Sequence, residues 1–218
     1  MTDNELRTAV VAERRDQVDL LAGLTPEQWD LPTLCTGWRV REVIAHTTTP
    51  YRYSLPRLVV ELVKARGDFN RMSDRTARRD AERMSAAELL TALRDNVAHP
   101  WTPPGGGVVG ALSHDVIHGL DYTVGLGLDR VVPPERVGLV LGGMEPKNIA
   151  FFGADLDGVE LRATDLDWTY GAGEPLRGRA QDLLLVICGR RLPDGLLDGA
   201  PAARFTADAA IDGAQDDR

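Results

Sequence analysis

The chain has 218 residues, enough to bury the core of one large domain or two small ones. Charged residues make up 27% of it and hydrophobic residues 43%, which is typical of a soluble globular protein. The net charge of −8 argues against general nucleic-acid binding, which depends on a basic surface that meets phosphates. No stretch approaches the roughly 18 apolar residues of a membrane span, and the first residues lack the pattern of a signal peptide. We therefore expect a cytoplasmic protein that enters no membrane.

Amphipathic helical patterns dominate the first half of the chain. Residues 5–22 predict a first helix, and the capping box at 25–28, with its proline at the first helical position, predicts a short second one. A third helix is predicted from Thr36, as its cap, through His46, because apolar residues recur there with the helical period. The same period over residues 55–63 predicts another strongly amphipathic helix.

The middle of the chain continues as helices. Residues 66–83 are dense in arginine and aspartate and predict a surface connection or a polar helix with a solvated face. A second capping box at 85–88 begins a helix that ends near His99. Further helices are predicted over residues 108–125 and 133–144.

The pattern changes after about residue 153. Residues 159–163 alternate like a half-buried strand, and residues 166–170 are expected to pair with it. A turn is predicted at 171–175, followed by a very apolar helix over 180–188 that Gly189 closes in the left-handed conformation.

These patterns predict an α+β fold that is predominantly α, without internal repeats. We expect a helical bundle over residues 1–152 and a small α/β domain over residues 153–218.

Two of the four histidines stand close together in the helix predicted at 108–125. His114, His118 and Asp121 are spaced to fall on one helical face, and Ile117 and Val124 beside them predict that this face points inward. Two imidazoles and a carboxylate are costly to bury unless a partner compensates them. A divalent metal is the obvious partner, because imidazoles at i and i+4 can converge on one ion. The alternative is a pair of histidines that lies on the protein surface and binds no metal.

A third imidazole would have to come from another helix, and His46, at the edge of the buried stripe of its helix, is the best choice. Three neutral nitrogens around zinc leave one coordination position open, as in catalytic sites, although nickel or iron would also accept this donor set. Asp121 could accept the outer ring proton of a ligand histidine. By contrast, Asp115 is expected to point away and be solvated, and His99, before a proline, is expected to have a surface or capping role.

The cysteines suggest no further chemistry. Cys35 and Cys188 are far apart and lack a CxxC motif, so neither a disulfide framework nor a thiolate zinc site is indicated. No base can be assigned to Cys35, so structural burial is favoured over a nucleophilic role.

Motifs in three parts of the chain resemble a known family. The N-terminal signature of the mycothiol-dependent maleylpyruvate isomerase family, within the DinB-like superfamily, is similar to LTPEQW at 24–29 and LCTGWRVREVIAH at 34–46. The family's second metal-bearing helix resembles HGLD at 118–121, with GLG at 125–127 and VVPPE at 131–135. Its small C-terminal domain is more loosely similar to ATD at 163–165, RG at 177–178 and LLLVICGR at 183–190.

The resemblance implies a four-helix bundle with a metal, usually zinc, held by His46, His118 and a residue four positions before the latter. In maleylpyruvate isomerase that third ligand is a glutamate, whereas here it is His114. Such a site resembles the three-histidine version common among DinB-like proteins, which include thiol transferases. The substitution puts the isomerase substrate in doubt more than the metal.

The resemblance also implies a mechanism. A low-molecular-weight thiol, mycothiol, would bind the metal, lose its proton and attack a small electrophilic substrate, giving either cis–trans isomerisation or S-transfer. Arg190, which matches the family's C-terminal arginine, would clamp a carboxylate of substrate or thiol, with a plain surface role as the equal alternative. The partners expected are therefore a small electrophile and a thiol, and both a monomer and a homodimer stay open. The competing hypothesis is a non-catalytic protein that binds a metal or small ligand on the same scaffold.

Overall fold

The structure is a computed structural model that describes residues 2–207, apart from the side chains of residues 148 and 151. It divides into two compact units, residues 1–130 and residues 131–218, and each is described by itself. Within the described residues, no helix combines the length and apolar character needed to cross a bilayer.

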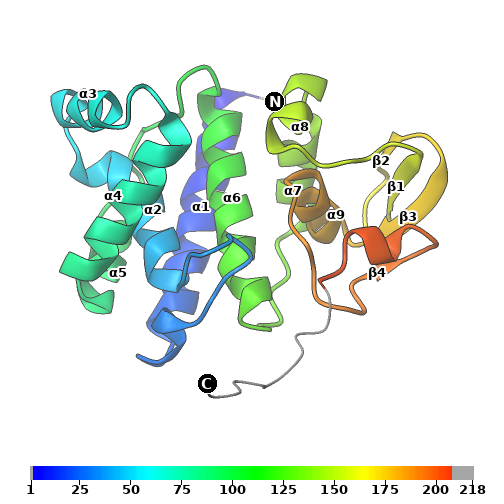
Figure 1. The fold of residues 1–218 in the computed structure, drawn as a ribbon, viewed down its shortest axis with the longest axis horizontal. Helices are drawn as coiled ribbons and strands as arrows, with labels where there is room; N and C mark the ends of the chain where they lie inside the picture. Colours follow the sequence, from blue (N-terminus) through cyan, green and yellow to red (C-terminus); the bar gives the residue numbers. More distant parts are fainter. Residues whose placement is uncertain (1, 208–218) are drawn as a thin grey trace, which may run out of the picture. The chain divides into compact units, whose positions relative to one another are not determined.

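The first unit is a helical bundle. Its helices are α1 (Asp3–Ala22), a 3-10 turn η1 (Gln28–Asp30), α2 (Val40–Arg52), α3 (Leu55–Lys64), α4 (Phe69–Arg83), α5 (Ala86–Arg94) and α6 (Gly107–Gly125). Helix α1 packs along α6, and α2 packs against α4, α5 and α6 (Figure 1). Helices α4 and α5 follow one another along the chain and both pack against α2, so together they complete the bundle. Its core is formed by apolar side chains that include Leu21, Val43, Ile44, Leu89 and Tyr122.

Helix α2 begins at Val40, so the prediction of Thr36 as its cap is wrong. Residues 33–38 instead form a turn, in which the Thr33 amide donates to the Trp38 carbonyl at 3.0 Å. Gly37 lies within this turn at φ +76°, which residues with a side chain rarely adopt. The helix starts with a capping box in which Glu42 accepts from the backbone N–H of Arg39 at 2.8 Å.

The segment predicted as a surface connection or a polar helix with a solvated face is helix α4, and one of its faces is buried. Met72, Ala77 and Ala81 are buried on that face, and α4 packs against α2. Because arginines alternate with these residues along the sequence, the apolar stripe is narrow and gives a weak helical pattern. The stripe still suffices for close packing against α2.

Helix α3 lies where its period predicted a helix, but its aliphatic stripe faces solvent. Leu55 and Val63 are 77% and 71% exposed, and the buried side chain of α3 is Glu61. Arg75 and Arg79 of α4 donate to that carboxylate at 2.7 and 3.2 Å. These ion pairs therefore turn the polar face of α3 inward.

The second unit combines helices with a four-stranded sheet. It contains α7 (Pro134–Gly142), α8 (Pro146–Phe152), β1 (Val159–Ala163), β2 (Thr169–Gly171), β3 (Glu174–Gly178), α9 (Ala180–Ile187), β4 (Leu197–Asp198) and a 3-10 turn η2 (Ala202–Arg204). The strand order is β2-β1-β3-β4, with β1 antiparallel to β2 and parallel to β3. Helix α9 packs against β1 and β3, and α7 packs against α9. The domain boundary expected after residue 152 thus falls inside this unit.

Several predictions for this unit are confirmed. Strands β1 and β2 pair as expected, and α9 ends with Gly189 at φ +72°. The turn expected at 171–175 is shorter, because β3 begins at Glu174 and pairs with β1 through residues including Leu176. A mostly helical chain with a small sheet agrees with the predicted fold class.

A candidate metal centre between two helices

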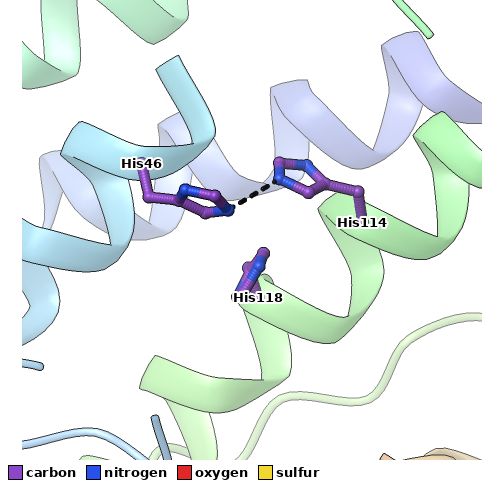
Figure 2. Close-up of side chains that lie close together, drawn as sticks. All are labelled: His46, His114 and His118. Atoms are coloured by element: carbon purple, nitrogen blue, oxygen red, sulfur yellow. Dashed lines mark hydrogen bonds between the residues drawn. The ribbon is translucent and has the colours of Figure 1, made fainter. Parts of the chain in front are cut away.

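The structure brings together the three histidines that the sequence singled out. His46 lies on α2, and His114 and His118 lie one turn apart on α6, so their rings converge in the space between the two helices (Figure 2). Ring nitrogens of the three residues lie within 4.8 Å of one another. The closest pair is His46 Nε2 and His114 Nε2, at 3.2 Å.

Carboxylates engage the outer nitrogens of the two rings on α6. His118 Nδ1 lies 3.0 Å from Asp121 Oδ2, the contact that the spacing predicted, and His114 Nδ1 lies 3.2 Å from Asp115 Oδ1. A carboxylate beside Nδ1 favours the tautomer with the proton on that nitrogen. The Nε2 lone pairs of both rings are then available to a cation.

The prediction that Asp115 is solvated is wrong. Its side chain is 3% exposed, and it forms an ion pair with the fully buried Arg14 of α1, whose Nε lies 2.7 Å from Asp115 Oδ2. Arg14 Nη1 also donates to the carbonyl of His99 at 2.8 Å. Arg14 follows Val10 by four residues and precedes Val18 by four, so its place in an apolar stripe was a signal that it is buried.

Burial keeps the His46 ring neutral. Burial lowers the pKa of His46 well below its usual value, and the neighbouring His118 and His114 lower it further. Neutral imidazole is the form that binds metal ions, so this ring is a competent ligand at neutral pH. Trp38 and Trp101 pack against the cluster, with ring centroids 5.1 Å from His46 and 5.2 Å from His114 respectively.

The donor set fits a divalent cation. Two nitrogens at 2.0–2.1 Å from a tetrahedral zinc ion stand about 3.3 Å apart, and the two nearest ring nitrogens here are 3.2 Å apart. His114 and His118 are 16% and 15% exposed, so the site has an open side. The fourth histidine, His99, lies outside the cluster, and its Nδ1 accepts from the amide of Trp101.

Sequence reasoning missed the contact that Cys35 makes with the site. Its half-buried Sγ donates to Asp121 Oδ2 at 2.9 Å and lies 3.8 Å from His118 Nδ1. Cys35 stands in the turn before α2, where no periodicity can tell which way a side chain points. Only its place within the LCTGW stretch linked it to the site.

Arg190 belongs to the second unit. It lines a cavity of about 400 Å³ together with Arg191 and Arg204, and its Nη1 donates to the carbonyl of Cys188 at 3.0 Å. Its role as a carboxylate clamp stays a prediction.

Fold and site together define a class of protein: a DinB-like helical bundle with a histidine cluster between two helices, followed by a small α/β unit. The crystal structure of a histidine-to-alanine mutant of the mycothiol-dependent maleylpyruvate isomerase superposes with a TM-score of 0.52 and 14% identity, covering 93% of this chain and 94% of that one. A second crystal structure of mycothiol-dependent maleylpyruvate isomerase matches over the same shares, at 14% identity and a TM-score of 0.42. No curated protein matches the sequence significantly.

The N-terminal part of the sequence is similar to a known domain family. Residues 10–114 match the family model of the mycothiol maleylpyruvate isomerase N-terminal domain. This match agrees with the resemblance that the motifs at 24–29 and 34–46 indicated.

Proposed function

We propose that this protein is a metal- and mycothiol-dependent enzyme that acts on a small electrophilic substrate by isomerisation or S-transfer. The observation that carries the proposal is the convergence of His46, His114 and His118 on one point, with carboxylates beside the Nδ1 atoms of two of the rings. The match of residues 10–114 to the mycothiol maleylpyruvate isomerase N-terminal domain supports mycothiol as the thiol. Zinc is the cation we expect, with nickel and iron as alternatives.

The charges around the cluster suit thiol activation. A divalent cation held by three neutral imidazoles would stabilise the thiolate form of a thiol that binds beside them, and so supply a nucleophile near neutral pH. Asp115 and Asp121 lie on the outer side of the rings, where they orient the imidazoles, and Arg14 balances the charge of Asp115. The donor set itself therefore carries no negative charge.

The remaining side chains of the site orient the rings and limit access of water. Trp38 and Trp101 pack against two of the imidazoles and would shield those sides from water. His114 and His118 are partly exposed, so a thiol would approach the cation from their side. The proposed site is thus preorganised in its rings and accessible from one direction.

Two reactions are open to a thiolate there. In isomerisation, sulfur forms a bond to one carbon of an activated double bond, and the π electrons move to the activating carbonyl. After rotation about the resulting single bond, the electrons return to re-form the double bond, the C–S bond breaks, and the thiolate and the trans product are released. In S-transfer, the new C–S bond is kept while a leaving group departs with its electron pair.

The test uses purified, zinc-loaded protein and mycothiol against a panel that contains maleylpyruvate, other cis-alkenoic acids, epoxides and alkyl halides. Isomerisation gives a product of unchanged mass without consumption of thiol, whereas S-transfer adds the mass of the thiol. We expect turnover of at least one class, its loss in His118→Ala and its retention in the control His99→Ala. Binding of zinc and mycothiol without turnover of any class would favour the non-catalytic binding protein instead.

We also propose Arg190 as a carboxylate-binding residue. The cavity that it lines with Arg191 and Arg204 is rich in guanidinium groups, which bind carboxylates well. Arg190→Ala should raise KM for a carboxylated substrate while the zinc content stays at the wild-type value. An unchanged KM would contradict a carboxylate-binding role for Arg190.

A further inference from the structure

The turn formed by residues 33–38 places a thiol against the carboxylate that orients His118. We infer that Cys35 is a positioning residue, whose thiol fixes Asp121 and, through it, the His118 ring. The inference rests on the proposed function insofar as it treats His118 as a metal ligand. It gives a role to a cysteine that the proposed reaction does not use.

The hydrogen bonds to Asp121 carry the inference. A single carboxylate oxygen, Asp121 Oδ2, lies 2.9 Å from the Cys35 sulfur and 3.0 Å from His118 Nδ1. The Asp121 side chain is fully buried, and a buried carboxylate depends on its donors. Held by a thiol on one side and a ring N–H on the other, the carboxylate cannot rotate without losing a donor. Cys35 therefore restricts the orientation of His118 without touching a cation.

The backbone fixes the position of the thiol. The Leu34 amide donates to the carbonyl of Asp121 at 3.0 Å, so the turn is tied to the residue that its thiol contacts. One helical turn later, a Cβ on Gly125 would lie 2.8 Å from the Thr33 Cα and 3.2 Å from the Pro32 carbonyl oxygen. Only a glycine at this position lets the turn approach α6 so closely.

Two other roles for Cys35, apolar packing and direct metal ligation, predict different results from the hydrogen-bonding role. As a small apolar packing residue, it would be replaced well by alanine and poorly by serine. As a hydrogen-bond donor, it would be replaced well by serine and poorly by alanine. As a direct ligand, it would hold a cation with His118 and Asp121, whose ligand atoms also lie within 4.8 Å of one another and of Cys35.

The first measurement is the zinc dissociation constant, by competition with a chromophoric chelator, for wild type, Cys35→Ser, Cys35→Ala and Cys35→Val. Loss of a group that orients a ligand histidine typically weakens metal binding by 10–100-fold. We expect Cys35→Ser to bind within about threefold of wild type, and the variants without a donor to bind about tenfold more weakly, at the lower end of that range. Serine binding zinc as weakly as alanine, or more weakly, would overturn the inference. Valine provides a second donor-free variant of similar size if alanine fails to fold.

The second measurement needs no metal. In the metal-free protein, ¹⁵N NMR of the histidine rings should show His118 as a single Nδ1–H tautomer in wild type and Cys35→Ser, and as a mixture in Cys35→Ala. Identical His118 signals in all three proteins would overturn the inference. If wild type binds no zinc, the proposed function fails, while this measurement still decides the role of Cys35.

Cobalt substitution tests the direct-ligand alternative. Cobalt-loaded wild type should lack a thiolate-to-cobalt charge-transfer band, because sulfur donates a hydrogen bond instead of binding the ion. A band that is present in wild type and lost in Cys35→Ser would show direct ligation and would overturn the positioning role.

Discussion

Replacement of His118 by alanine removes one of three imidazoles and leaves the buried carboxylate of Asp121 without the ring that it orients. The zinc affinity of the chain should fall steeply. His99→Ala is the matched control, because this histidine lies outside the cluster and donates no atom to it.

The magnitude follows from the number of ligands. Four-ligand zinc sites bind with roughly 10–16 kcal/mol, or about 2.5–4 kcal/mol per ligand, so loss of one ligand should weaken binding by roughly 70- to 900-fold. Free zinc at 1,000 times its dissociation constant stabilises a folded protein by about 4 kcal/mol, which for a chain of this length raises Tm by roughly 8–16 °C. At the same zinc concentration, His118→Ala should gain only about 0.4–1.6 kcal/mol, or roughly 1–6 °C.

The assay compares thermal unfolding with zinc and with a chelator for wild type, His118→Ala and His99→Ala. Elemental analysis after dialysis accompanies it. Wild type and His99→Ala should show the full zinc-dependent shift and retain about one zinc per chain. A His118→Ala protein with the wild-type shift and zinc content would refute the assignment of this residue as a ligand.

Three further predictions concern stability. Gly125→Ala should lower the free energy of unfolding in urea by about 1–3 kcal/mol, because its Cβ would lie 2.8 Å from the Thr33 Cα in the turn. Gly142→Ala, whose Cβ would have nothing within 4 Å, should leave that free energy unchanged. Equal effects of the two substitutions would contradict the close approach. Asp115→Ala should cost about 3–5 kcal/mol by leaving Arg14 buried and unpaired, and an unchanged urea midpoint would rule out the buried ion pair. Burial raises the pKa of Asp182 to about 6, so the folded state binds the carboxyl proton more tightly than the unfolded state does. The stability that this tighter proton binding contributes is lost as pH rises from about 4 through 6. Asp182→Asn should therefore gain up to about 3 kcal/mol at pH 7.5 and little at pH 4, and an equal gain at both would contradict this shift.

Helical periodicity predicted the part of the site that lies within helices. The spacing of His114 and His118 determines that they share a face of α6, and the apolar period around His46 indicates that its ring reaches the bundle interior. For the same reason most helices, and the β1–β2 pair, lie where their patterns placed them.

Periodicity could not predict contacts that depend on tertiary structure. Asp115 is buried because Arg14, 101 residues away, covers that side of α6. Cys35 reaches Asp121 through a turn without a repeating pattern. The stripe on α3 marked a helix correctly, but buried ion pairs to Glu61 decide which of its faces points inward. The local sequence shows that two faces of a helix differ in polarity, whereas the packing of neighbouring elements determines which face is buried.

X-ray absorption of the zinc-loaded protein, before and after addition of mycothiol, tests the central proposal most directly. We expect nitrogen ligands from three imidazoles and no protein sulfur at first, and one Zn–S distance of about 2.3 Å after the thiol is added. A zinc environment unchanged by mycothiol, or sulfur already bound before its addition, would contradict a three-histidine centre that binds and activates a thiol.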